Sequence, residues 1–191
     1  MEKKGISQAV IQRLPRYYRY LEDLMDQKID RISSSELSKR MHLTASQIRQ
    51  DLNNFGGFGQ QGYGYSVDGL YREISAILGL DKEYKMVIVG AGNLGQAIAK
   101  YTKFHKQGFK ICAAFDINAD LVGKQLEGIQ IYDQEELVEY VEREEIDIGI
   151  ICVNQENAQE VADKLCFAGV RGIWNFAITD IEVPSHVALE I

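Results

Sequence analysis

The sequence lacks several features that would narrow its class. No apolar run is long enough to cross a bilayer, and the amino-terminal residues lack the apolar core of a signal peptide. Cysteine occurs only three times, at Cys112, Cys152 and Cys166, and never in a CxxC pair. An odd cysteine count without such pairs argues against a disulfide framework. We therefore expect a cytoplasmic protein whose three cysteines are reduced core residues, with a redox-active thiol as the less favoured alternative.

Positive charge is also scarce, because 21 Lys and Arg residues stand against 28 Asp and Glu residues. Taken over the whole chain, the net charge of −7 argues against nucleic acid as a partner. The charge is unevenly distributed, however. Residues 1–80 contain 11 basic and 9 acidic residues, or +2, whereas residues 81–191 contain 10 and 19, or −9. This asymmetry indicates two domains, 1–80 and 81–191, with different partners.

A dinucleotide-binding pattern lies near the middle of the chain. Apolar residues at 86–89 predict a buried strand, and the following helical pattern has Leu94, Ile98 and Tyr101 on one face. A second apolar strand, 111–115, ends at Asp116. Between the first strand and the helix stands a GxGxxG motif, formed by Gly90, Ala91, Gly92, Asn93, Leu94 and Gly95. Strand, glycine turn, helix, strand and acid follow in the order of a Rossmann dinucleotide site.

Each residue type in this pattern has a physical role. Gly90 permits a tight turn, Gly92 leaves room for a pyrophosphate beside the backbone, and Gly95 lets the helix pack close to the sheet. Free N–H groups at the helix start attract the phosphates. Asp116, 21 residues after Gly95, would bind a ribose diol and repel a 2′-phosphate, which favours NAD(H) over NADP(H). The alternative is a Rossmann-like domain whose glycine turn serves packing alone.

The amino-terminal segment 7–28 has the spacing of an amphipathic helix. Pro15 inside it marks either a kink or a helix start. Arg13, Arg16 and Arg19 form either a solvated face or contacts to DNA phosphates, and for Arg16 the two alternatives are balanced.

Two short helices, at about 35–41 and 45–54, are predicted next. Capping-box patterns mark their starts, in Ser33 with Glu36 and in Thr44 with Gln47. The short turn between them has the spacing of a helix-turn-helix, whose second helix enters the major groove of DNA. The residues of that helix expected to be exposed and able to read bases are Ser46, Gln47, Arg49, Gln50 and Asn53. The expected core residues are Leu37, Met41, Ile48 and Leu52. The alternative is a helical pair used for protein contacts.

Glycine and aromatic residues alternate over residues 54–65. Such a glycine density excludes a helix interior and predicts a β-hairpin, the wing of a winged helix. Its tip carries the neutral residues Gln60 and Gln61, so electrostatic attraction to DNA is weaker there. A helix at 67–80 completes the first domain, and a polar joint at 81–83 follows it.

Strands and helices alternate after Asp116. The expected strands are 129–132, 146–153 and 170–176, and the expected helices are 135–145 and 156–168. The loops at Asn154 and Asn175 follow two of these strands, at the sheet edge where open α/β sheets bind ligands. Asn175 would either donate to a nicotinamide carboxamide or form a turn. The predicted fold class is therefore α/β: an N-terminal winged helix-turn-helix and a C-terminal Rossmann domain with a doubly wound, mostly parallel sheet.

Together these features resemble the Rex family of bacterial redox-sensing transcriptional repressors. The resemblance extends over about residues 8–190. It is carried by the stretches 13–18 (RLPRYY), 47–52 (QIRQDL), 54–65, 89–95 with 115–118 (FDIN), and 172–177 (GIWNFA). The glycine–aromatic run is the most specific of them, because a generic dinucleotide domain has no reason to carry it beside a helix-turn-helix.

The resemblance implies a homodimer that binds inverted-repeat operator DNA when NAD⁺ dominates or without cofactor, and that is released when NADH binds. The regulated genes would serve fermentation and respiration. NAD⁺ and NADH would be allosteric ligands that are not turned over, so neither enzyme activity nor a metal or membrane partner is expected. By position, Tyr101 resembles the family tyrosine near the nicotinamide. Arg16 resembles the arginine that senses the cofactor-dependent domain arrangement.

Two sets of site residues follow. The expected cofactor-binding residues are Gly90, Ala91, Gly92, Asn93, Leu94, Gly95, Tyr101, Asp116, Ile117, Lys124, Val153, Asn154, Asn175, Phe176 and Ala177. The expected DNA-binding residues are Arg16, Thr44, Ser46, Gln47, Arg49, Gln50, Asn53, Gln61 and Tyr63.

Three features depart from the family pattern. Gln60 and Gln61 stand where the family often has a basic wing residue, and Val153-Asn154 stands where a Val-Pro pair is usual. The family also continues with a C-terminal helix that is exchanged between subunits and carries an acidic residue near the nicotinamide. This sequence stops at Ile191, so we expect that helix to be absent from it.

Two other functions compete with this interpretation. An NAD-dependent dehydrogenase would need a proton donor or acceptor near the nicotinamide. The only histidines, His42, His105 and His186, are expected at the surface and away from strand ends, although a tyrosine or lysine acid stays open. The third interpretation is a module that binds CoA or a nucleotide and no DNA.

Overall fold

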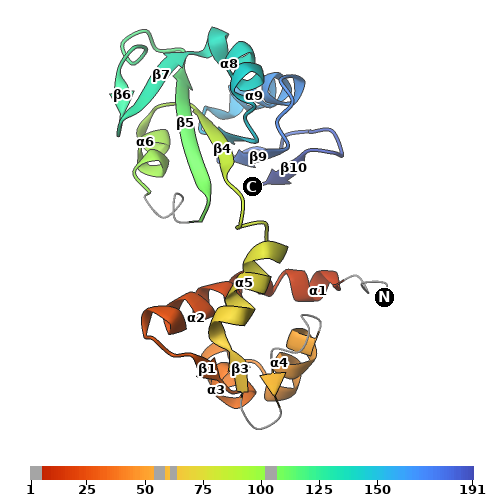
Figure 1. Ribbon diagram of the computed structural model, residues 1–191. Coiled ribbons are helices and arrows are strands. Elements are labelled where there is room, and N and C mark those ends of the chain that lie inside the picture. Colours follow the sequence, from red (N-terminus) through yellow and green to blue (C-terminus); the bar gives the residue numbers. More distant parts are fainter. Residues whose placement is uncertain (1–5, 54–58, 61–63, 102–106) are drawn as a thin grey trace. The chain divides into compact units, whose positions relative to one another are not determined.

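The computed structural model describes residues 6–53, 59–60, 64–101 and 107–191 (Figure 1). By its internal contacts the chain divides into two compact units, Met1–Asp81 and Lys82–Ile191. No helix within the described ranges is long and apolar enough to cross a membrane.

The first unit is a small helical domain with a short sheet. Its elements in order are α1 (Gln8–Ile11), α2 (Leu14–Asp26), β1 (Arg31–Ile32), α3 (Ser34–Met41), α4 (Ala45–Leu52), β2 (Gly59–Gln60), β3 (Gly64–Ser66) and α5 (Val67–Ile77). Strand β3 lies between β1 and β2 and is antiparallel to both. The predicted hairpin is therefore confirmed in β2 and β3, whereas β1 is a strand that the sequence did not predict.

Local sequence sets where these helices begin. Helix α2 has Pro15 in its first turn, where a missing N–H does no harm, so the helix start predicted as one alternative for Pro15 is confirmed. The segment predicted as one helix over 7–28 is therefore two helices, α1 and α2. Ser33 forms the complete capping box with Glu36. Thr44 accepts a hydrogen bond from the Gln47 backbone N–H, but the side chain of Gln47 turns to Asp51 instead of completing a second box.

The core of this unit joins its four longer helices. Leu14, Tyr17, Leu21 and Leu24 of α2 meet the apolar faces of the other helices and are fully buried. The buried partners on α3, α4 and α5 are Leu37, Met41, Ile48, Leu52, Leu70 and Ile74. The four core residues predicted for α3 and α4 are thus confirmed.

The second unit is a parallel sheet with helices on both faces. Its elements in order are β4 (Tyr84–Val89), α6 (Asn93–Ala99), β5 (Phe109–Asp116), β6 (Gln125–Leu126), β7 (Ile129–Asp133), the 3₁₀-helix η2 (Gln134–Glu136), α8 (Leu137–Glu144), β8 (Ile148–Ile151), α9 (Gln155–Phe167), β9 (Gly172–Asn175) and β10 (Ala188–Glu190). The described strands form one sheet in the order β10-β9-β8-β4-β5-β7-β6. All pairs are parallel except β6 with β7.

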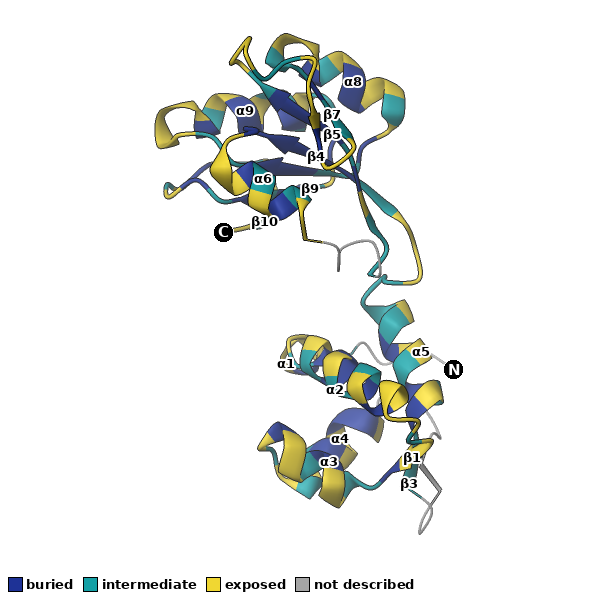
Figure 2. Ribbon diagram, turned by 90° about the vertical axis from the view of Figure 1, so that its left-hand side faces the viewer, coloured by how far each residue is buried: buried dark blue, intermediate teal, exposed yellow. Residues whose placement is uncertain are grey.

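This strand order is doubly wound. The chain moves outward from β4 through β5 to β7, then returns to the other side of β4 with β8, β9 and β10. Helices α8 and α9 cover one face and share a core with Val87 and Val89, while α6 packs on the other face against Met86 and Ile88 (Figure 2). The carboxyl ends of β4 and β8 therefore meet at a topological switch point, where open α/β sheets bind ligands.

Helix α6 corrects one sequence interpretation. Leu94, Ile98 and Tyr101 were expected on one face of the helix, yet only Ile98 and Gly95 are buried in α6. The helix ends at Ala99, so Tyr101 lies beyond it, and both Leu94 and Tyr101 are exposed. The reason is that Gly95, not Leu94, makes the close approach to the sheet.

Candidate functional site

The glycine turn after β4 is shaped by two different demands. A Cβ on Gly90 would lie 2.5 Å from the carbonyl oxygen of Cys152, and the φ of Gly90 is +100°. A Cβ on Gly95 would lie only 2.0 Å from the carbonyl oxygen of Gly90. A Cβ on Gly92, by contrast, would meet no atom of the described residues within 4 Å. Packing therefore requires glycine at 90 and 95. At position 92 the missing side chain instead leaves open space beside the backbone, which a ligand could occupy.

Asp116 ends β5 beside this turn. Its Oδ2 accepts a hydrogen bond from the Ala91 backbone N–H at 2.7 Å, and its Oδ1 accepts one from the Asn118 backbone N–H at 2.8 Å. The carboxylate is half-buried and is held by the backbone on either side. The predicted juxtaposition of the glycine turn and the acid is therefore present in the structure.

A cleft of about 530 Å³ opens at these strand ends. It is lined by Gly90, Gly92, Asp116, Ile117, Asp133, Gln134, Glu135, Cys152, Val153, Asn154, Asn157, Glu160 and Lys164. Four of these residues are carboxylates, and the one described lysine, Lys164, is paired with Glu160 at 2.7 Å. The cleft thus favours a ligand that offers hydroxyl groups to carboxylates over one that brings additional phosphate to them.

The cleft brings together six of the predicted cofactor residues: Gly90, Gly92, Asp116, Ile117, Val153 and Asn154. Ala91, Asn93, Leu94 and Gly95 belong to the same turn and to the first turn of α6. Tyr101, Lys124, Asn175, Phe176 and Ala177 are not among the residues that line this cleft in the described part of the chain. Sequence reasoning missed Asp133 to Glu135, although they follow the predicted strand at 129–132 and the strand-end rule that selected Asn154 would have found them.

Asn175 adopts the turn-forming role of its two alternatives. The residue is almost fully buried, its Nδ2 donates to the carbonyl oxygen of Thr179 at 2.9 Å, and its Oδ1 accepts from the Ala177 N–H at 2.9 Å. Of the two alternatives for Asn175, the structure therefore shows the turn-former, because its amide shapes the loop after β9.

The three thiols are free and half-buried. Burial raises the pKa of Cys152 to about 12 and also raises the pKa values of Cys112 and Cys166. Thiolates are disfavoured at such sites, which supports the interpretation of reduced, unreactive cysteines. Within the described ranges, no group of three or more His, Cys, Asp and Glu side chains could hold a metal ion.

Helices α3 and α4 form the predicted helix-turn-helix. Ser46, Arg49, Gln50 and Asn53 are exposed along α4 and its end, and Thr44 caps its start. Gln47 was expected among the exposed readers but is only half-exposed, and its Nε2 donates to Asp51 Oδ1 at 2.8 Å. Gln61 and Tyr63 lie outside the described residues.

Two arginines at the start of α2 also differ from expectation. Arg13 forms a two-point ion pair with Asp51, with both N–O distances 2.8 Å, so it belongs neither to a solvated face nor to a phosphate-contacting one. Arg16 is half-buried and its Nη2 donates to the carbonyl oxygen of Met41 at 2.7 Å, at the end of α3. Both residues therefore tie α2 to the helix-turn-helix.

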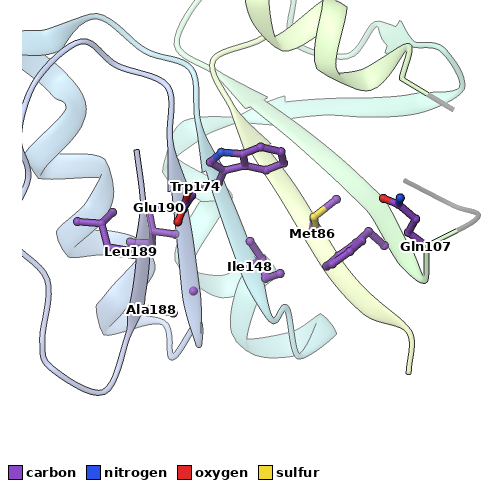
Figure 3. A pocket seen from close by; sticks show the side chains of 10 residues that line it. Met86, Gln107, Ile148, Trp174, Ala188, Leu189 and Glu190 are labelled. Atoms are coloured by element: carbon purple, nitrogen blue, oxygen red, sulfur yellow. The ribbon is translucent and has the colours of Figure 1, made fainter. Parts of the chain in front are cut away.

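A second hollow of about 380 Å³ lies on the sheet face that carries α6. Its lining is mostly apolar and includes Met86, Ile148, Trp174 and Leu189 from β4, β8, β9 and β10. Figure 3 shows Met86, Ile148 and Trp174 side by side on neighbouring strands. This hollow has neither the glycine turn nor the four carboxylates of the first cleft, and Glu190 is the one carboxylate among the described residues that line it.

Comparisons with known proteins match both units. Residues 5–53 match a family model described as a putative DNA-binding protein N-terminus, and residues 81–179 match the CoA binding domain. The redox-sensing transcriptional repressor Rex of Clostridium beijerinckii is 58% identical over all of this chain and 90% of its own length. Rex of Thermoanaerobacter pseudethanolicus is 56% identical over 99% of this chain and 84% of its own.

The chain belongs to the Rex family. This is a family of transcriptional repressors, which are regulators and not enzymes. A crystal structure of the repressor RSP in complex with NAD⁺ and operator DNA superimposes with a TM-score of 0.92 at 56% identity, covering 98% of this chain and 86% of that one. RSP in complex with NADH gives a TM-score of 0.88 at 53% identity, covering 97% and 86%.

Proposed function

We propose that this chain is a redox-sensing transcriptional repressor that binds operator DNA through its first unit and NAD(H) through its second. The observation that carries the proposal is the presence, in one chain, of a helix-turn-helix and of a glycine turn facing Asp116. The similarity to RSP bound to NAD⁺ and operator DNA supports it. A repressor acts where the operator is, so we place the protein in the cytoplasm.

NAD⁺ and NADH are the proposed ligands of the glycine-turn cleft. The pyrophosphate would lie beside Gly92 and the N-terminus of α6, and Asp116 would accept the ribose hydroxyls. Other proposed contacts come from Ala91, Asn93, Leu94, Gly95, Ile117, Val153 and Asn154, with Tyr101, Lys124, Phe176 and Ala177 toward the nicotinamide end. Asn175 enters only as the residue that shapes its loop.

The match to the CoA binding domain favours a second candidate ligand. CoA carries a phosphate on its adenosine ribose, and in the cleft this phosphate would lie next to the Asp116 carboxylate. Because four carboxylates line the cleft and Lys164 is already paired with Glu160, that phosphate would meet mainly negative charge. The dinucleotide with a free ribose diol fits better, and CoA serves as the competitor in the binding test.

DNA would be contacted by α4 and its flanks. Ser46, Arg49, Gln50 and Asn53 are exposed and of the types that hydrogen-bond base edges or phosphates. Thr44 at the start of α4, Arg16 on α2, and Gln61 and Tyr63 in the wing segment complete the proposed surface.

A homodimer on an inverted repeat is part of the proposal. The apolar hollow around Trp174 supports it, since an apolar sheet face of this kind is normally covered in the working protein. NADH would favour a dimer whose two α4 helices no longer match the one-turn spacing of roughly 34–36 Å between half-sites. A response of about 100-fold in DNA affinity requires ~2.7 kcal/mol of coupling, which is within the usual range for allostery. Genes of fermentation and respiration are the proposed targets.

Fluorescence anisotropy tests this function. The full chain is titrated onto a labelled duplex that contains an inverted repeat, and NADH, NAD⁺ or CoA is then added at fixed salt. We expect tight binding, release by NADH at micromolar concentrations, and neither NAD⁺ nor CoA causing release. No preference over shuffled DNA would refute the repressor. Release of the protein from DNA by CoA would identify CoA, and not NAD(H), as the regulatory ligand.

A further inference from the structure

One carboxylate of the first unit is buried with an unusual set of donors. Asp51 in α4 is 0% exposed. Arg13 donates to both of its oxygens at 2.8 Å, Tyr17 donates to Oδ2 at 2.9 Å, and Gln47 donates to Oδ1 at 2.8 Å. A buried charge is tolerated only when paired and hydrogen-bonded in this way.

The donors come from two helices in fixed geometry. Arg13 and Tyr17 lie four residues apart at the start of α2, and Gln47 and Asp51 lie four residues apart on α4. The fork of an arginine held on both carboxylate oxygens allows little sliding or rotation between the two helices. Burial alone would raise the pKa of Asp51, but the hydrogen bonds from Arg13, Gln47 and Tyr17 outweigh it and lower that pKa, so the carboxylate stays charged.

This arrangement changes the role of Gln47. Its backbone N–H bonds the cap residue Thr44, and its side-chain amide bonds a buried acid. Arg49 and Gln50, on neighbouring positions of α4, are exposed instead. The amide of Gln47 is thus directed into the protein, although its type and its place in a recognition helix would suit base reading.

We propose that the Arg13–Asp51 pair fixes the orientation of α4 for reading DNA, and that Gln47 is a positioning residue of this pair and not a base reader. The inference rests on the proposed DNA-binding function and goes beyond it by assigning roles within α4. A base reader affects one position of the DNA site. A residue that orients the whole helix affects every position that α4 reads.

The test begins with the wild-type protein. Its preferred sequence is selected from a pool of random duplexes, and affinity is then measured for that sequence, for each single base-pair replacement, and for a shuffled duplex. If the wild type enriches no sequence, the proposed function fails before the inference is reached. If it does, Gln47→Ala, Gln50→Ala and Arg13→Lys are compared on the same duplexes.

For Gln47→Ala we expect an affinity loss of about tenfold for the preferred duplex, with the penalty of base-pair replacement reduced at every position that α4 reads, because all contacts of α4 weaken together. Binding to the shuffled duplex and its salt dependence stay unchanged, because phosphate contacts are not altered. Gln50→Ala should instead lose discrimination at one base pair. If Gln47→Ala flattens the preference at a single base pair, Gln47 is a reader and the proposal is overturned.

Arg13→Lys keeps the charge but not the fork, so it should show the same uniform loss. Asp68→Asn removes an exposed acid that pairs with Arg72 on α5 of the same unit and serves as the matched control with no expected effect. Helix content from circular dichroism is measured for every variant. A loss in Arg13→Lys that extends equally to the shuffled duplex would refute positioning, because general unfolding removes both kinds of binding.

Discussion

Asp116 Oδ2 accepts a hydrogen bond from the backbone N–H of Ala91 at 2.7 Å, which joins the end of β5 to the glycine turn after β4. The bond orients the carboxylate toward the turn, and the second oxygen is held by the Asn118 N–H. The acid that would read the ribose is therefore pre-oriented by the same backbone that would cradle the phosphates. Loss of the acid should affect ligand choice more than it affects the fold.

Replacing Asp116 by Ala tests its proposed role in ligand selection. NADH should bind more weakly by ~1.5–3 kcal/mol, because hydrogen bonds to a charged acceptor are lost. The affinity for NADPH should rise relative to that for NADH, because the negative charge that repels the 2′-phosphate of NADPH is gone. Both affinities can be followed by energy transfer from Trp174, the only tryptophan, to the reduced nicotinamide. An unchanged NADPH to NADH ratio would mean that Asp116 does not read the ribose.

Two glycines of the same turn should respond in opposite ways to alanine. In Gly92→Ala the new methyl group enters open space, and φ −70°, ψ −165° suits alanine, so stability should change by less than about 0.5 kcal/mol. Dinucleotide affinity should fall at least about tenfold, because the methyl group occupies the approach to the helix N-terminus.

Gly95→Ala is the matched comparison. Its Cβ would lie 2.0 Å from the Gly90 carbonyl oxygen, which belongs to the backbone and cannot move aside. We expect the second unit to be destabilised by about 1–3 kcal/mol or more. Urea unfolding followed by Trp174 fluorescence reports on this unit alone, since the chain has no other tryptophan. Equal stability losses in the two variants would contradict the assignment of Gly92 to a ligand.

The parts of the site that follow from local sequence could be predicted. The glycine turn and the acid are fixed by a short strand–turn–helix–strand pattern, and the caps at Ser33 and Thr44 depend on residues three positions away. Such features can be predicted from the sequence because they depend only on residues close to them in the chain and not on tertiary contacts.

The parts that failed depend on contacts between distant segments. Nothing near Gln47 in the sequence shows that Asp51 meets Arg13, 38 residues earlier. Strand β10 was missed because residues 188–190 are too few to show a strand period, and their pairing with β9 is a contact with another segment of the chain.

The raised pKa values of the thiols predict their chemistry. With a pKa of about 12, Cys152 is a thiolate in only about one molecule in 10⁴ in mildly alkaline buffer. Iodoacetamide should therefore label Cys152 far more slowly in the native protein than in urea, and mild peroxide should leave DNA binding unchanged. Site-resolved mass spectrometry measures the labelling. Rapid native labelling at Cys152, or peroxide release of DNA, would revive a thiol-based redox sensor.

The buried Asp51 carboxylate, with its donors Arg13, Tyr17 and Gln47, predicts how the stability of the first unit responds to acid. The pKa of Asp51 is lowered from 3.8 in the folded state, so its carboxylate stabilises the fold above that pH and loses this effect as the pH falls further. At neutral pH, the free energy of unfolding of Asp51→Asn should be lower by on the order of 2–3 kcal/mol, because Arg13 is left without its charged partner but keeps some contact with solvent. Below about pH 3.8 the wild type should lose stability more steeply than the variant, so that the two curves of stability against pH converge.

Urea unfolding followed by circular dichroism at several pH values measures these stabilities, with Asp68→Asn as the control whose exposed ion pair should change stability little. A constant difference between wild type and Asp51→Asn across that pH range would show that Asp51 is not the charged partner of Arg13, because protonation would then have no bond to break.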